Sequence, residues 1–152
     1  MTPIQKTVFQ ILQIFTQICE ALQLDYYLVC GSALGAVKYG GFIPWDDDVD
    51  VALFRDDYER FCKEAPALLP EHLFLQNFQS DPAFPAIYSK LRNSETTCIE
   101  ESVAALPINH GISIDIFPLD GYPTDKKEQE RLERKKAYPF PAFDRSLGKK
   151  QS

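Results

Sequence analysis

Residues 41–55 read Gly-Phe-Ile-Pro-Trp-Asp-Asp-Asp-Val-Asp-Val-Ala-Leu-Phe-Arg, and four aspartates fall within five positions of this stretch. Successive side chains of a β-strand project to opposite faces. In a strand over residues 48–54, Asp48 and Asp50 therefore share one face, and the valines share the other, toward a core. Two neighbouring carboxylates repel each other by roughly 1 kcal/mol in water and by more at lower dielectric. A cation between them removes this repulsion, so the stretch predicts a metal-dependent enzyme.

The bulk composition is that of one soluble globular domain. A chain of 152 residues can bury a core, and its net charge of −6 argues against broad binding to nucleic acid. No apolar stretch approaches the roughly 20 residues that span a bilayer. Three of the four cysteines (Cys19, Cys30 and Cys62, but not Cys98) lie in apolar segments, and none has metal-site spacing. This predicts buried reduced thiols and a cytoplasmic location.

Helices and strands are predicted to alternate along the chain. Thr2-Pro3-Ile4-Gln5 has the residues of a helix start with a capping box, and apolar residues then recur at spacings of three and four through Leu22. This predicts an N-terminal amphipathic helix that packs on the domain's own core. Strands are expected at residues 26–30, 48–54, 73–78, 87–91 and 111–118, with helices at residues 33–38 and 56–69. Residues 124–136 predict a polar helix, and residues 137–152 an irregular tail.

Three further motifs accompany the aspartates. Gly31-Ser32 follows the first expected strand, where backbone N–H groups can hold a phosphate, a plain turn being the alternative. Asp115 is a single carboxylate within the apolar strand 112–117, which is unusual on burial grounds. If that strand lies beside strand 48–54, three carboxylates converge, a ligand set that suits Mg²⁺ or Mn²⁺. Lys90 and Arg92 alternate onto one face and are suited to bind phosphate oxygens, or else lie solvated at a strand end.

The acidic stretch has other interpretations. A calcium loop of the EF-hand type that starts at Asp46 would need glycine at its sixth position, where Val51 stands. That interpretation is rejected. Asp46 and Asp47 belong either to a solvated acidic turn or to the support of the site. Trp45 is either a core or lid residue or a stacking platform for a base.

The order of these motifs resembles the nucleotidyltransferase superfold and, more closely, the LicD family. That family includes phosphocholine transferases and is related to fukutin-type proteins. The resemblance covers about residues 20–122 and rests on four segments: Gly31–Val37, Gly41–Val51, Tyr88–Arg92 and Ile114–Gly121. It implies an α/β (α+β) fold with a nucleotidyltransferase-like mixed sheet flanked by helices. Residues 1–122 would form the core, and residues 123–152 the polar helix and the tail, as the start of a C-terminal region.

The resemblance also implies a function. It implies metal-dependent transfer of a phosphocholine-like substituent from a nucleotide-linked donor such as CDP-choline to a sugar hydroxyl of a cell-surface glycan, such as lipopolysaccharide or teichoic acid. It implies no nucleic-acid partner and no membrane span, and it leaves peripheral association with a membrane open. Asp48, Asp50 and Asp115 would be the catalytic and metal-binding residues, with Asp115 either a ligand or a base. Nucleotide phosphates would be bound by Gly31, Ser32, Lys90 and Arg92, and support would come from Trp45, Asp46 and Asp47.

Two alternatives to this function stay open. The same carboxylates would serve a nucleotidyltransferase that acts on a small molecule or a protein. Family members also extend well beyond this length, into an aromatic-rich C-terminal region that is missing from these 152 residues. A truncated, non-catalytic domain that binds metal or nucleotide is therefore the second alternative.

Overall fold

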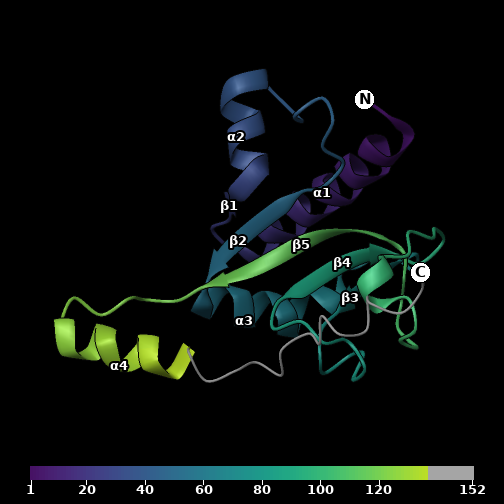
Figure 1. Ribbon diagram of the computed structural model, residues 1–152. Helices are drawn as coiled ribbons and strands as arrows, with labels where there is room; N and C mark the ends of the chain where they lie inside the picture. The colour runs from purple at the N-terminus through teal and green to yellow at the C-terminus, as the bar shows by residue number, and fades with distance from the viewer. Residues whose placement is uncertain (137–152) are drawn as a thin grey trace, which may run out of the picture. The chain divides into compact units, whose positions relative to one another are not determined.

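The computed structural model describes residues 1–136 (Figure 1). Met1–Asp120 form one compact unit, and the described residues from Gly121 onward belong to a second unit. The first unit contains, in order, α1 Pro3–Leu22, β1 Tyr27–Leu28, α2 Cys30–Tyr39, β2 Asp50–Phe54, α3 Arg55–Glu64, η1 Ala65–Ala67, β3 Leu73–Gln76, β4 Ser89–Asn93, η2 Glu101–Val103 and β5 Ile112–Leu119. The second contains the predicted polar helix, α4 Lys126–Lys136. The tail expected at residues 137–152 lies outside the described part.

The five strands form one mixed sheet in the order β1-β2-β5-β4-β3. Strands β2 and β5 pair in parallel, and the other three neighbouring pairs are antiparallel. The register places Asp50 opposite Asp115, and on the other side of β5 it places Lys90 opposite Asp115. The structure thus confirms a mixed α/β fold with helices flanking the sheet.

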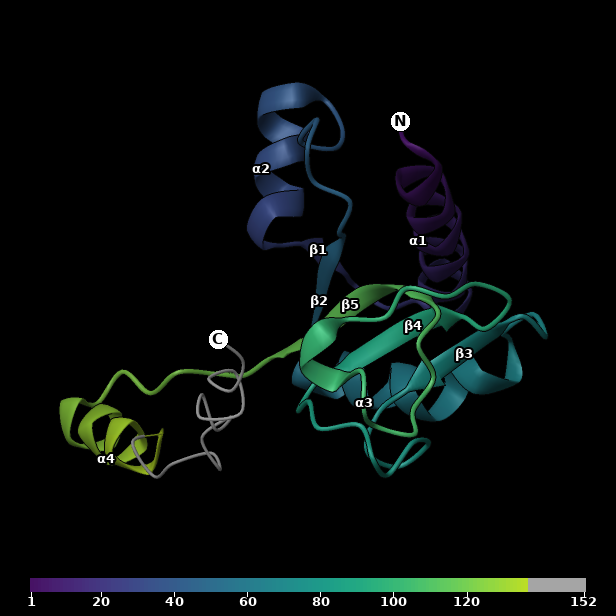
Figure 2. The same cartoon turned by 45° about the vertical axis from the view of Figure 1, so that its right-hand side comes forward.

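One face of the sheet packs against α1 and α3, which contact each other as well (Figure 2). Helix α1 begins as predicted, because the Thr2 hydroxyl accepts a hydrogen bond from the backbone N–H of Gln5, whose side chain accepts one from the Thr2 N–H. The core contains apolar residues from α1, α3 and alternate strand positions: Val8, Ile11, Phe15, Phe61, Val51, Leu53, Leu91, Ile114 and Ile116. The intervening positions, Asp50, Lys90 and Asp115, therefore project from the opposite face.

The structure corrects three local predictions. Strand β2 begins at Asp50 rather than Asp48, and the Asp48 carboxylate accepts a hydrogen bond from the Val49 N–H just before the strand. Helix α2 begins at Cys30 rather than at residue 33. Cys19 is buried as predicted, but Cys62 is only partly buried and Cys30 is exposed, since it begins a helix at the surface. Within residues 1–136, no helix combines the length and the apolar character needed to cross a bilayer.

Candidate metal and phosphate site

Three carboxylates meet at one edge of the β2–β5 pair. Asp48, Asp50 and Asp115 each offer an oxygen, and these oxygens lie within 4.8 Å of one another. Asp50 and Asp115 are neighbours across the parallel ladder, and Asp48 reaches them from the loop that precedes β2. Although Asp48 is not in a strand, its carboxylate joins the other two.

The loop that carries Asp48 is held in place by hydrogen bonds from two helices. The Asp46 carbonyl accepts a hydrogen bond of 2.7 Å from the side-chain amide of Gln5 on α1, and Gln5 is only 4% exposed. The Ser32 hydroxyl on α2 accepts a hydrogen bond of 2.8 Å from the Asp50 N–H. Past Asp48, the chain is fixed to β5, because the Val49 carbonyl accepts a bond of 2.9 Å from the Asp115 N–H. The metal-ligand candidates are therefore positioned by α1, α2 and β5 together.

Asp115 is the most buried of the three, with 6% of its surface exposed. Its Oδ1 lies 2.9 Å from the Lys90 Nζ, an ion pair between two buried groups. The ammonium group of Lys90 therefore compensates the charge of Asp115 in part, and the negative charge of Asp48 and Asp50 beside it remains for a further cation.

The crowding of carboxylates changes their acidity. Burial, and then the charges of Asp115 and Asp50, raise the pKa of Asp48 to about 6. Burial and then Asp115 also raise the pKa of Asp50. Burial, the largest single influence, lowers the pKa of Lys90, but the charge and hydrogen bond of Asp115 together with Tyr88 and Glu100 outweigh burial, so that this pKa is raised. The site therefore favours added positive charge, whether from protons or from a metal ion.

These residues fit a hard divalent cation. Mg²⁺ and Mn²⁺ prefer carboxylate oxygens, and here the oxygens of three carboxylates converge. One lysine cannot neutralise three carboxylates, so an excess of negative charge remains at the site. Asp48, Asp50 and Asp115 are the residues that would hold the ion.

Gly31 and Ser32 lie in the first turn of α2, where backbone N–H groups point out of the helix. A Cβ on residue 31 would come within 3.0 Å of the Asp46 carboxylate, so glycine lets that loop approach the helix closely. Because Ser32 also bonds to Asp50, the helix start and the carboxylates form one connected unit. This is a suitable place for a phosphate beside a metal ion.

Lys90 and Arg92 lie on the same face of β4, and 7% and 2% of their surfaces are exposed. The Arg92 guanidinium donates through Nε to the Gln76 side chain and through Nη1 to the Gly111 carbonyl. Glu100 Oε1 lies 3.0 Å from Lys90 Nζ and 3.8 Å from Arg92 Nη2. An anionic oxygen thus already occupies a place between the two cations. Of the Arg92 nitrogens, Nη2 is the one that faces this position.

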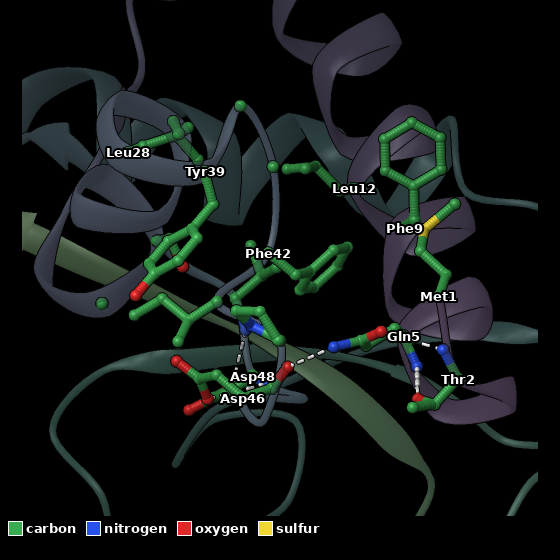
Figure 3. Close-up of a pocket in the computed structure, with 18 residues that line it drawn as sticks. Met1, Thr2, Gln5, Phe9, Leu12, Leu28, Tyr39, Phe42, Asp46 and Asp48 are labelled. Atoms are coloured by element: carbon green, nitrogen blue, oxygen red, sulfur yellow. Dashed lines mark hydrogen bonds between the residues drawn. The ribbon is translucent and has the colours of Figure 1, made fainter.

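Two cavities meet at Asp48. The larger, of about 850 Å³, is lined by Gly31, Ser32, Asp46 and Asp48 together with apolar residues of α1 and α2 (Figure 3). The smaller, of about 280 Å³, contains Asp47, Asp48, Lys90, Arg92, Glu100 and Asp115 among its lining residues. Trp45 is 80% exposed and packs edge-on against Tyr39, so it is not a core residue.

Three residues of this region escaped the sequence interpretation. Gln5 was identified as a helix-capping residue, but its side chain also holds the aspartate loop. Glu100 lies outside the regular elements, and a glutamate in a loop carries no signal in the sequence of a lysine ten residues away that it will contact. Tyr88 lines the smaller cavity, and burial, followed by the charge of Asp115, raises its pKa to about 12. Only Tyr88 had a usable signal, since it precedes the Ser-Lys-Leu-Arg motif.

The chain is similar in sequence to several known proteins. Over 123 residues the chain is 32% identical to the lipopolysaccharide cholinephosphotransferase LicD of Haemophilus influenzae, a match that covers 81% of this chain and 45% of the relative. Over 40 residues it is 45% identical to the ribitol 5-phosphate transferase FKRP of Homo sapiens, which covers 26% of this chain and 8% of the relative. An uncharacterized protein of Rickettsia prowazekii is 23% identical over 139 residues, or 91% of this chain and 48% of the relative. The chain thus spans less than half the length of these curated relatives.

A family model also matches the chain over residues 23–146. The match contains the start of α2, the aspartate-rich stretch and the β4 and β5 strands, which are the parts that build the site. The model is described as the nucleotidyltransferase domain of LicD, FKTN and FKRP, and the chain belongs to this LicD/FKTN/FKRP family.

Proposed function

We propose that this protein is a metal-dependent phosphotransferase that moves a phosphocholine-like substituent from a nucleotide-linked donor, such as CDP-choline, to a sugar hydroxyl of a cell-surface glycan. The observation that carries the proposal is the convergence of Asp48, Asp50 and Asp115 beside the start of α2. The relatives support it, because one is named as a cholinephosphotransferase acting on lipopolysaccharide and another as a ribitol 5-phosphate transferase. Both names describe transfer of a substituted phosphate. We place the reaction in the cytoplasm, where nucleotide-linked donors are made.

The carboxylates would bind Mg²⁺ or Mn²⁺, and Lys90 would orient Asp115 as the third ligand. When bound, the ion neutralises the charge of the donor phosphates and the charge that develops during transfer. The N–H groups of the first α2 turn and the Ser32 hydroxyl would bind the phosphate next to the ligands. Trp45, Asp46 and Asp47 belong to the loop that carries Asp48 and support its position.

Lys90 and Arg92 are proposed to bind donor phosphate oxygens from the smaller cavity. The carboxylate of Glu100 supports this role, since it already lies at ion-pair distance from both cations. The diphosphate of the donor carries two negative charges and offers several acceptor oxygens, so it would compete with the single carboxylate of Glu100 for the two cations. Of the two basic residues, Lys90 has the closer approach, because it also contacts Asp115.

A transfer assay with purified protein, CDP-choline, Mg²⁺ and a glycan acceptor tests the proposal. We expect Asp50→Asn to lower turnover by about a hundredfold or more, because a neutral amide no longer balances the ion that stabilises the transferring phosphoryl group. Asp25→Asn is the matched control, since Asp25 is exposed and lies outside the carboxylate trio and outside both cavities. Its turnover is expected to stay near that of the wild type.

Two results would speak against the proposal. One is wild-type turnover by a folded Asp50→Asn protein. The other is a product whose mass has increased by a nucleotidyl group, since that would show nucleotidyl transfer instead of phosphocholine transfer. Circular dichroism of both variants confirms that they are folded.

A further inference from the structure

We infer that the 850 Å³ cavity beside the carboxylates binds the nucleoside of the donor, with its base against the aromatic side chains between α1 and α2. The inference rests on the proposed function, because it takes the donor to be nucleotide-linked. Beyond that function, the inference assigns the nucleoside of the donor to the larger cavity and the phosphates to the metal site.

The cavity lies between the N-terminal half of α1, helix α2 and the loop that joins α2 to the aspartates. Its volume of about 850 Å³ is within the range of pockets that enclose a cofactor-sized ligand. Figure 3 shows Asp46 and Asp48 together at one end of it, and Phe9 and Leu12 of α1 toward the other. The cavity thus has one acidic end and one apolar end.

The side chains in the wall of the cavity do not favour an anionic occupant. Among the described residues, no lysine, arginine or histidine lines it, whereas Asp46 and Asp48 both do. Aromatic surface comes from Phe9, Tyr39 and Phe42. A neutral group with an aromatic ring matches this wall, because bases stack on aromatic side chains whatever their sequence.

The position of the cavity connects such a group to the reacting phosphates. Gly31, Ser32 and Asp48 line it and also belong to the proposed phosphate and metal site. The smaller cavity on the other side of Asp48 has Lys90 and Arg92 in its wall and suits an anion. A donor whose phosphates lie at the metal site would therefore direct its uncharged nucleoside into the larger cavity.

Asp46 is placed to recognise the ribose. Its carboxylate accepts one long hydrogen bond, of 3.4 Å from the Asp48 N–H, and no other within residues 1–136. The remaining acceptor capacity suits the two hydroxyls of a ribose.

A quaternary ammonium group would also be compatible with two carboxylates. Such a cation binds where several aromatic faces surround it within about 6 Å. Here Phe9 and Tyr39 project from helices on different sides of the cavity, with Phe42 between them (Figure 3). Rings spread over a cavity of this volume fit an extended nucleoside better than one compact cation.

Calorimetric titration of the 152-residue chain with cytidine 5′-monophosphate and with phosphocholine, each with excess Mg²⁺, tests the inference. Tyr39→Ala removes a ring that is 41% exposed, so the fold should be retained. We expect its Kd for cytidine 5′-monophosphate to be weakened by about tenfold, the effect of losing one stacking partner. Tyr39→Phe keeps the ring and should bind like the wild type. Val37→Ala is the matched control, since Val37 lies on the same helix, is 89% exposed and does not line the cavity.

For phosphocholine, we expect the same Kd in all four proteins. The inference is overturned if the wild type does not bind cytidine 5′-monophosphate, if Tyr39→Ala binds it normally, or if Tyr39→Ala instead loses phosphocholine. The last result would assign the cavity to the transferred group. The proposed function fails by a different result, namely wild-type turnover by Asp50→Asn in the transfer assay. That result would not affect a nucleotide-binding site that depends on Tyr39.

Discussion

The buried side chain of Asp115 lies between a carboxylate that repels it and a lysine that attracts it. Its neighbour across the parallel ladder is Asp50, and its neighbour across the antiparallel ladder is Lys90. A carboxylate buried in an apolar strand costs free energy unless it is paired. Lys90 offsets part of that cost, but Asp48 and Asp50 add negative charge again. At the residue scale, the negative charge around Asp115 therefore exceeds the positive charge that Lys90 supplies.

The raised pKa of Asp48 leads to a prediction about stability without metal. Its pKa is about 6 in the folded chain, against an ordinary value of 3.8, so the folded state holds this proton more tightly than the unfolded state. The corresponding stability is present below the ordinary pKa and is lost as the pH rises through 6. In a metal chelator, we expect the Tm of the wild type to fall relative to that of Asp48→Asn between pH 4 and pH 7.

The raised pKa of Asp50 also makes the folded state less stable as the pH rises, and this contribution remains in Asp48→Asn. Added Mg²⁺ should reverse the loss in the wild type, because the ion replaces the proton. If the difference in Tm between the wild type and Asp48→Asn stays constant from pH 4 to pH 7, the raised pKa of Asp48 is contradicted. Differential scanning calorimetry at matched ionic strength makes the measurement.

Arg92 joins three parts of the chain. Its guanidinium bonds to Gln76 on β3 and to the Gly111 carbonyl just before β5, and it is almost fully buried. We expect Arg92→Met to lower the free energy of unfolding by about 2–4 kcal/mol, since buried acceptors lose their charged donor. Arg55→Met is the control, because Arg55 pairs with Asp120 at the exposed surface and should change stability by about 1 kcal/mol or less. Urea denaturation of both variants gives the comparison, and equal losses would contradict it.

At the scale of elements, the site depends on α1 as much as on the sheet. Helix α1 packs on β4 and β5 with its apolar face, and its first turn holds the aspartate loop through Gln5. The same side chain closes the capping box with Thr2. One residue therefore fixes both the start of the helix and the position of the loop that carries Asp48.

We expect Gln5→Ala to lower the free energy of unfolding by about 1–3 kcal/mol, because it removes the side-chain half of the capping box and leaves the partly buried Asp46 carbonyl without its donor. It should also weaken binding of Mn²⁺ by several fold, as the loop is no longer held. Gln10→Ala is the control, since Gln10 is an exposed glutamine of the same helix. Calorimetry measures the stability of both variants, and titration measures their Mn²⁺ affinity. Equal stability and equal Mn²⁺ affinity of Gln5→Ala and Gln10→Ala would contradict the prediction.

At the scale of the whole molecule, periodicity predicted much of the fold. The capping box and apolar stripe located α1, and a lone aspartate between isoleucines located the middle of β5. The parallel pairing of β2 with β5, which brings Asp50 to Asp115, was a condition that the sequence could suggest but not establish. Periodicity assigns a side chain to a face, but it does not tell which loop crosses that face. For this reason Glu100 and the second role of Gln5 were missed, and Cys30 was placed in the core instead of at the start of α2.

The central claim is that Asp48, Asp50 and Asp115 form a divalent metal site. Titration of the 152-residue chain with Mn²⁺, followed by electron paramagnetic resonance of the free ion, tests it most directly. We expect saturable binding by the wild type and by the Asp25→Asn control, with loss of about tenfold or more in affinity in both Asp50→Asn and Asp115→Asn. Equal Mn²⁺ affinity in all four proteins would contradict the claim.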